Sequence, residues 1–130
     1  MKKILACMIM AFAVAFSAAA ADINAILAPF NKDLPAQFGP GNTLDNVEAV
    51  DNQVIYNFTI DEDQIAFATV EAQADMFKSV FVAETVSSPD KDMQALRKYC
   101  IDNNWHIIYR FKGTKSGKTL DIVLDVDSLK

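Results

Sequence analysis

Cysteine and histidine are nearly absent from this chain. Its 130 residues include two cysteines and one histidine. Cys7 lies in an N-terminal segment that we expect to be removed, so Cys100 has no partner for an internal disulfide, even in an oxidising compartment. The domain must therefore be held together by the burial of apolar side chains, which is feasible at its length.

Long apolar runs are also missing, except at the N-terminus. Lys2 and Lys3 precede an apolar stretch at residues 4–16, and the small residues that follow end in an Ala-x-Ala pattern at residues 19–21. This is the layout of a secretory signal peptide. The apolar stretch is about 13 residues long, short of the roughly 20 that span a bilayer. We therefore predict a signal peptide at residues 1–21, one domain at residues 22–130, a periplasmic or secreted location, and no membrane attachment after cleavage.

Positive charge is scarce as well. The sequence has 12 lysines and arginines against 17 aspartates and glutamates, and removal of Lys2 and Lys3 leaves ten against 17, a net charge of −7. An acidic surface repels phosphate backbones, so we expect no nucleic-acid binding. The acidity favours solubility and points weakly to a basic partner.

Internal repeats, low-complexity segments and linkers are absent, which favours a single domain. Residues 22–32 predict a first helix because their apolar side chains recur at helical spacing, and Pro29 within this pattern is expected to kink or end the helix. A hairpin is predicted over residues 44–60. A turn at residues 51–52 pairs Ala49 with Val54 and Val47 with Tyr56, which places both pairs on the core side.

Two helices are predicted next. Asp61 followed by Gln64 resembles a capping box and predicts a long helix to about residue 86. Its apolar face consists of Phe67, Val70, Ala74, Phe77 and Phe81. Ser88, with Pro89 in the first helical position, predicts the start of another helix that ends near residues 103–104.

The last hairpin has the clearest pattern, because residues 105–112 and 120–127 both alternate apolar and polar side chains. A turn at residues 116–117 pairs Phe111 with Ile122, Tyr109 with Leu124, Ile107 with Val126, Lys112 with Asp121, and His106 with Asp127. The element order α-β-β-α-α-β-β therefore predicts an α+β fold. We expect one four-stranded antiparallel sheet with helices packed on one face and solvent on the other.

Several short segments carry a family resemblance. They are Leu34-Pro35, Thr43-Leu44, Tyr56-Asn57-Phe58-Thr59, Ser88-Pro89 and Leu96-Arg97. Over most of residues 22–130 they resemble small bacterial periplasmic proteins grouped as quorum-sensing-regulated virulence factors, and kindred uncharacterised families. Such relatives often have a cysteine just before the proline of the third helix and another near the C-terminus. This chain has neither. The resemblance implies an exported accessory or virulence-linked role with no known reaction.

Few residues could support catalysis or metal binding. His106 opposite an aspartate could form an acid–base pair, but the sequence shows no nucleophile or oxyanion site beside it. We interpret it as a cross-strand pair on the solvated face. Cys100 lies beside the core stripe at a helix C-terminal end, which favours a buried inert thiol. Asp121, Asp125 and Asp127 alternate along an extended strand and cannot converge on one ion. We therefore expect no metal and no cofactor.

Core packing is the default interpretation of the alternating aromatic residues, and an apolar ligand cleft is the alternative. The polar sheet face and the edge strands could dock a partner by strand addition, although ordinary solubility and edge protection explain them too. Our candidates for ligand or partner contacts are Tyr56, Trp105, His106, Tyr109 and Arg110.

The sequence thus predicts an exported, non-enzymatic, monomeric accessory protein that binds a protein partner or a small apolar ligand. The alternative is a small exported hydrolase or thiol enzyme that uses His106 or Cys100.

Overall fold

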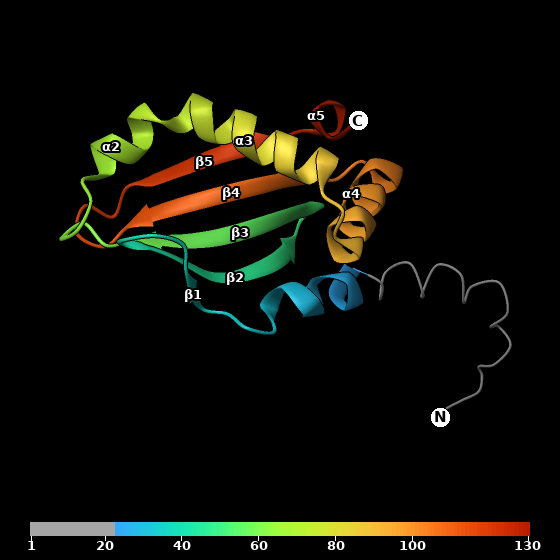
Figure 1. The fold of residues 1–130 in the computed structure, drawn as a ribbon, viewed down its shortest axis with the longest axis horizontal. Coiled ribbons are helices and arrows are strands. Elements are labelled where there is room, and N and C mark those ends of the chain that lie inside the picture. Colours follow the sequence, from blue (N-terminus) through green and yellow to red (C-terminus); the bar gives the residue numbers. More distant parts are fainter. Residues whose placement is uncertain (1–22) are drawn as a thin grey trace, which may run out of the picture.

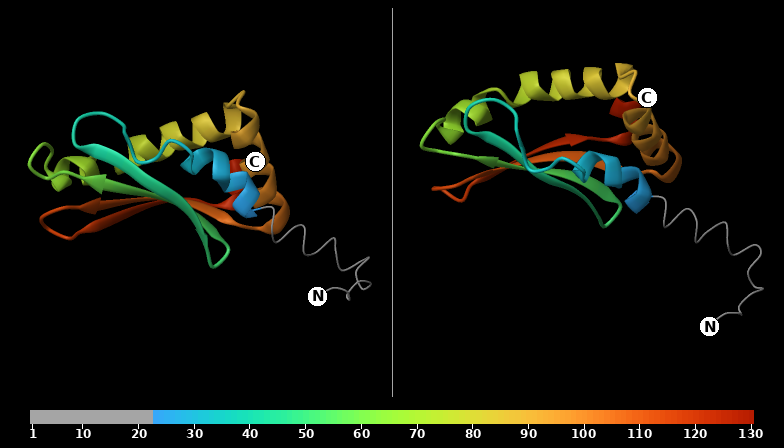
Figure 2. Two further views of the ribbon diagram at one scale, coloured as in Figure 1. Left: turned by 90° about the horizontal axis from the view of Figure 1, so that it is seen from below. Right: turned by 60° about the horizontal axis from the view of Figure 1, so that its bottom comes forward.

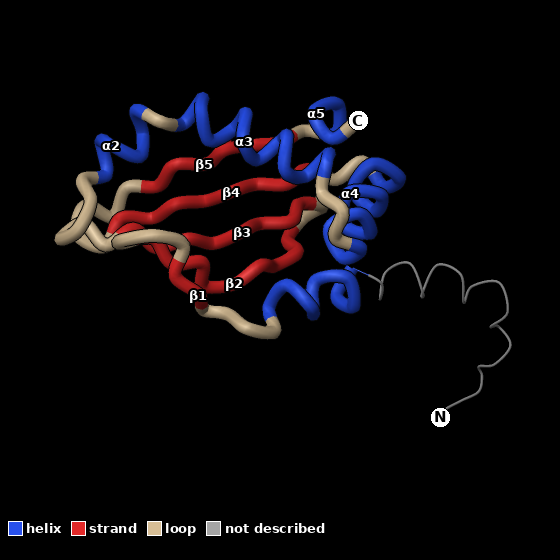
Figure 3. Tube along the Cα trace, in the orientation of Figure 1, coloured by secondary structure: helices blue, strands red, loops and turns tan. Residues whose placement is uncertain are grey.

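Five strands form one sheet. The computed structural model describes residues 23–130, so the predicted signal peptide lies outside the described residues. The strands are β1 (Ala36–Gln37), β2 (Asn42–Val50), β3 (Gln53–Ile60), β4 (His106–Gly113) and β5 (Thr119–Leu124). They lie side by side in sequence order (Figure 1). The four predicted strands are present, and the short β1, formed within a long loop (Figure 3), adds a fifth.

Helices cover one face of this sheet. An N-terminal helix at residues 23–31 is followed along the chain by α2 (Phe67–Ala72), α3 (Ala74–Ser87), α4 (Lys91–Asn103) and α5 (Val126–Leu129). Figure 2 shows the helices on the same side of the sheet. The predicted α+β class with a one-sided helical cover is confirmed.

The core lies between the helices and the covered face of the sheet. Alternate residues of each long strand point into it, and several side chains are fully buried. The core residues of the four long strands are Leu44, Val47, Val54, Tyr56, Phe58, Ile60, Ile107, Tyr109, Phe111, Ile122 and Leu124. The helices contribute Ile23, Leu27, Phe67, Val70, Leu96, Cys100 and Leu129.

The first hairpin has the predicted register. Val47 pairs with Tyr56 and Ala49 with Val54. Asp51 and Asn52 both have positive φ angles, 50° and 63°. Tight hairpin turns of this kind need two consecutive positive φ angles, and aspartate and asparagine tolerate them better than most residues.

The two hairpins do not join in the predicted way, because β3 and β4 are parallel. The expectation of an all-antiparallel sheet is therefore wrong. The chain leaves β3 at one end of the sheet, returns over the covered face through α2, α3 and α4, and enters β4 from the end where β3 began (Figure 1). A helical crossover of this kind places the next strand parallel to the one before it.

The register of the last hairpin also differs from the prediction. Tyr109 pairs with Ile122, Ile107 with Leu124, and Arg110 with Asp121. A shift of two residues keeps every side chain on its expected face, so the alternation of the sequence cannot detect it. Strand β5 ends at Leu124, and Asp127, the predicted partner of His106, belongs to α5 instead.

The predicted helix starts are wrong at two places. Asp61 does not begin a helix, since its carboxylate accepts hydrogen bonds from Asp63 N and the Gln64 side chain within a turn. The helix starts at Phe67 and breaks at Gln73, which separates α2 from α3. In α4 the N-cap is Asp90, which accepts a hydrogen bond from Met93 N, whereas Ser88 accepts one from Asp90 N outside the helix.

Glu62 braces the turn between β4 and β5. Its Oε1 atom accepts hydrogen bonds from the backbone N–H groups of Lys115 and Ser116, both at 2.7 Å. A side chain at Gly113, the last residue of β4, would displace this carboxylate, because a Cβ atom there would lie 2.3 Å from the same oxygen. These bonds lower the pKa of Glu62 below its ordinary value of 4.5, and the bond from Ser116 N has the largest effect.

The Glu62 brace makes stability depend on acid pH. Because the folded-state pKa is the lower one, the stabilisation is complete above the ordinary carboxyl value and is lost as the pH falls through the folded value. We expect Glu62→Gln to flatten the decline in thermal midpoint between about pH 6 and about pH 3, measured by circular dichroism. An unchanged pH profile in this variant would contradict the assigned role of Glu62.

The two faces of β5 predict opposite responses to truncation. Leu124 is fully buried, whereas Val123 is 40% exposed on the other face. Leu124→Ala should lower the free energy of unfolding by about 2–5 kcal/mol. Val123→Ala should cost less than about 1 kcal/mol. Chemical denaturation of both variants measures the difference, and equal losses would show that the faces are misassigned.

Candidate functional site

The predicted contact residues are divided between the two faces of the sheet. Tyr56 and Tyr109 point into the core, whereas His106 and Arg110 lie on the face without helices. Trp105, just before β4, is half-buried with its ring edge-on to Tyr99 at a centroid distance of 5.3 Å. These five side chains therefore do not converge on one site, and their role in binding stays a prediction.

The aromatic residues of the covered face form a stacked cluster. Tyr56 stacks on Tyr109 with ring centroids 4.5 Å apart, and Tyr109 stacks on Phe81 of α3 at 4.0 Å. Phe58 and Phe111 continue the stack at 4.7 Å. All four strand residues are at most 7% exposed. Core packing is therefore the observed use of these rings, as the default interpretation expected.

Hydroxyl groups lie inside this cluster. The hydroxyls of Tyr56 and Thr85 are buried and have no hydrogen-bond partner among the described residues. Burial raises the pKa of Tyr109 to about 12. Burial also raises the pKa of Tyr56 well above its ordinary value of 10.0. Both phenols therefore stay protonated at neutral pH and act as neutral polar groups in an apolar core.

His106 begins β4 on the uncovered face. Its neighbour on β3 is Gln53, not an aspartate. Its Nδ1 atom is buried and has no hydrogen-bond partner among residues 23–130. Asp125, just after β5, accepts hydrogen bonds at its carboxylate from Ser128 N and Oγ, and the backbone bond is the main reason that the pKa of Asp125 is lowered. The predicted acid–base pair with Asp127 is thus not formed.

The polar residues of the uncovered face are mostly paired with one another. Arg110 donates two hydrogen bonds to Asp121, at 2.8 and 3.0 Å. Asn57 donates to Glu48 at 2.6 Å and to Asn46 at 2.9 Å. The hydrogen bonding of Arg110 to Asp121 is the main reason that the pKa of Arg110 is raised. This face therefore offers a self-paired polar ladder.

Cys100, on α4, is fully buried and belongs to the hydrophobic core. Burial raises the pKa of the thiol to about 12. A thiol with that pKa is almost entirely protonated at neutral pH and is a poor nucleophile. The interpretation of Cys100 as a buried thiol is confirmed.

The three C-terminal aspartates are used separately. Asp121 binds Arg110, Asp125 caps α5, and Asp127 lies 3.7 Å from Lys130 Nζ. Within residues 23–130, no three metal-ligating side chains are placed to hold one ion.

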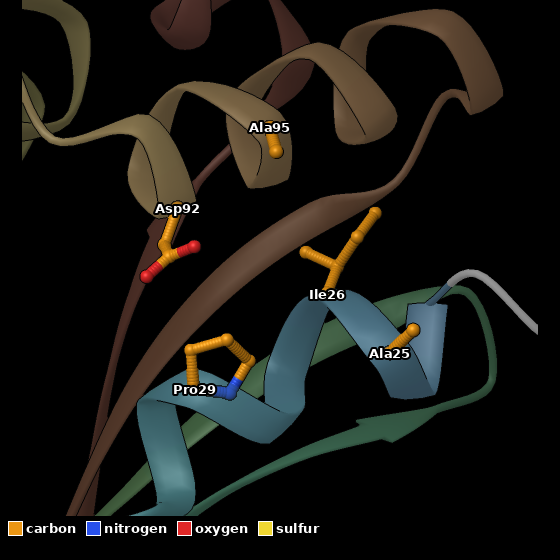
Figure 4. A pocket seen from close by; sticks show the side chains of 5 residues that line it. All are labelled: Ala25, Ile26, Pro29, Asp92 and Ala95. Carbon is orange, nitrogen blue, oxygen red and sulfur yellow. The ribbon is translucent and has the colours of Figure 1, made fainter.

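A narrow groove lies between the N-terminal helix and α4 (Figure 4). It has a volume of about 280 Å³ and is lined by Ala25, Ile26, Pro29, Asp92 and Ala95. The side chains of Ile26 and Asp92 point into the gap from opposite helices. Asp92 has no ion-pair or hydrogen-bond partner in the described part of the chain. Sequence reasoning placed Ile26 on an apolar helix face, but it could not show that α4 runs beside that face.

Two shallower hollows lie along α3. One, of about 520 Å³, is lined by Asp75, Lys78, Ser79, Val82 and Ala83. The other, of about 500 Å³, is lined by Ala83, Glu84, Ser87, Ser88 and Pro89. Neither hollow is lined by the stacked aromatic residues.

No helix of residues 23–130 has the length and apolarity needed to cross a bilayer.

Comparison with known proteins shows a shared fold. No protein-family model and no curated protein matches the sequence. The structure is similar to a Pseudomonas aeruginosa protein described as a "putative secreted protein", with a TM-score of 0.68 and 12% identity over 86% of this chain and 93% of that chain. It is also similar to the pilotin of the Vibrio vulnificus type 2 secretion system, with a TM-score of 0.59 and 14% identity over 88% of this chain and 93% of that chain.

The burial of Cys100 predicts slow alkylation. At about pH 8, iodoacetamide should modify the folded protein at least about a hundredfold more slowly than the protein unfolded in urea. In the folded protein the reagent cannot reach the Cys100 sulfur, and the thiol is not ionised to the reactive thiolate. Mass spectrometry follows the modification. Comparable rates in the two states would contradict the buried position of the thiol.

Proposed function

We propose that this chain is an exported, non-enzymatic accessory protein that binds another protein. The observation that carries the proposal is the groove between the N-terminal helix and α4. The fold supports it, since the two similar structures are a protein described as secreted and a component of a secretion system. The virulence-linked role implied by the family resemblance stays a prediction.

The dimensions of the groove favour a protein over a small apolar ligand. Pockets for small molecules usually enclose roughly 300–1,000 Å³. The groove has about 280 Å³ and lies open between two helices, and the stacked aromatic cluster is closed by its own packing. A groove of this size suits one or two apolar side chains of a partner, held between Ile26 and Ala95.

Charge adds a preference for a basic partner. Asp92 is the single charged residue that lines the groove, and it is exposed. Residues 22–130 as a whole carry a net charge of −7. A lysine or arginine beside the partner's apolar anchor would pair with Asp92, and the acidic domain would attract such a segment at long range.

The rival enzyme proposal receives less support. His106 lies on the uncovered face of the sheet, and Cys100 lies in the core on the other side. The two candidates therefore cannot act on the same bond. An activated nucleophile requires a serine, threonine or cysteine that is hydrogen-bonded to the base. His106 has no such bond among the described residues.

Filling the groove should abolish partner binding. A photo-crosslinking amino acid at the exposed Ala25 should give one dominant adduct with another protein in the periplasm. Ala95→Trp should reduce that adduct by about tenfold, because the indole ring occupies the space of the anchor. Ala72→Trp, at an exposed alanine outside the groove, is the matched control and should leave it unchanged. Gel electrophoresis with mass spectrometry measures the adduct.

Equal loss of the adduct in both tryptophan variants, or no adduct in any of them, would contradict binding through this groove. Asp92→Asn should weaken the adduct more at low salt than at high salt, because exposed charges are screened by ions. His106→Ala should have no effect.

A further inference from the structure

The two edges of the sheet are not equivalent. At the β2 edge, β1 pairs with Thr43 and Leu44, and a bulge interrupts the strand between Leu44 and Asn46. Beyond the bulge, the Asn31 side chain donates a hydrogen bond to Val47 O and accepts one from Val47 N, both at 2.8 Å. An asparagine amide thus takes the place of a neighbouring strand. Bulges and covering segments of this kind block further strand pairing.

The β5 edge has no such protection. Gly113 N donates to Lys118 O, and the register then alternates bonded and non-bonded pairs along β4 and β5. Leu120, Ile122 and Leu124 therefore direct their backbone groups to β4. The N–H and C=O groups of Thr119, Asp121 and Val123 point away from the sheet, and no described residue outside β5 bonds to them.

Helix α3 supplies a wall beside this edge. The helix packs against β5 and runs along it (Figure 1). The charge of Lys78, on this helix, contributes to lowering the pKa of Asp125, which follows the end of the strand. Val82 of this helix is partly buried against the core. Because α3 lies on the covered face, side chains on the inner face of an added strand would lie on the side of the sheet that this helix covers.

We propose that β5 accepts an additional antiparallel strand from a partner protein, a segment that is apolar toward α3 and basic on its other face. This inference rests on the proposed function in one respect, that the partner is a protein. The three outward backbone positions supply the pairing, as in other cases of strand addition. The basic face is favoured by the net charge of −7 of residues 22–130, since Asp121 is itself already paired with Arg110.

A second copy of this chain fits the edge less well. The antiparallel register that pairs all three outward residues of both strands puts one Asp121 directly opposite the other, and like charges in that position are destabilising. Each copy also brings the same net negative charge. A basic segment meets neither obstacle.

The test uses a synthetic seven-residue peptide in which valine and lysine alternate. It should slow the amide hydrogen exchange of Thr119, Asp121 and Val123 by about tenfold or more, because these N–H groups become bonded. NMR of the purified protein resolves the individual amides. A matched peptide with glutamate in place of lysine, and one N-methylated at every backbone nitrogen, should give no protection.

Variants at Val123 test the position. Val123→Pro removes an N–H that points away from the sheet and should abolish the protection. Val123→Lys, at a side chain that is 40% exposed, keeps the fold and should weaken binding of the lysine peptide by about tenfold through like charge. Val123→Thr keeps the N–H and the shape and should bind as the parent protein does.

Protection at other amides, equal protection by the control peptides, or unchanged binding in Val123→Lys would overturn the inference. So would a homodimer in sedimentation that Val123→Lys dissociates, because the occupant would then be a second copy. The photo-adduct through Ala25 separates the two proposals. An adduct at Ala25 without slowed exchange at β5 would contradict strand addition and leave the proposed function in place. Slowed exchange at β5 without an adduct at Ala25 would contradict only the role of the groove.

Discussion

The apolar faces of β3 and β4 lie next to each other at the centre of the sheet, and the positions of the helices follow from the need to keep water from them. Because the two strands are parallel, the chain between them must cross the sheet, and the helices of that crossing, α2, α3 and α4, seal the core. Phe77 and Phe81 of α3 stack on the rings of Phe111 and Tyr109. Burial of apolar surface is the main source of stability available to a domain whose single described cysteine is free.

This constraint also decides where binding can occur. The aromatic rings pack against one another in the core, and most polar and charged residues of the uncovered face are hydrogen-bonded to one another. What remains is the boundary of the cover: the seam between the N-terminal helix and α4, the outer side of α3, and the free edge of β5. Both proposals use this boundary, where backbone or apolar groups have no partner within residues 23–130.

Local patterns accounted for much of the architecture. Alternation along residues 54–60 and 105–112 identified the strands and their core faces, and the pair at residues 51–52 located a turn. The errors arose where a distant residue replaced a local partner. Asp61 opens a turn rather than the predicted helix, while its neighbour Glu62 bonds to the β4–β5 turn, and Asp125 caps α5 where a continuing strand was expected. A register shift of two residues preserves the alternation, so His106 lost its predicted aspartate without any sign in the sequence.

The sequence by itself determined most of the side chains that face the helices, because periodicity and polarity are properties of the local chain. It did not show that Ile55 and Ile108, on the uncovered face, are buried as well. It also determined the acidic charge and the shortage of catalytic residues. Only the tertiary structure decided that β3 and β4 are parallel, that Ile26 and Asp92 line the same groove, and that Asn31 blocks one edge while β5 stays open. These features depend on which elements meet in space, and the local sequence around a residue does not show which distant residues it will contact.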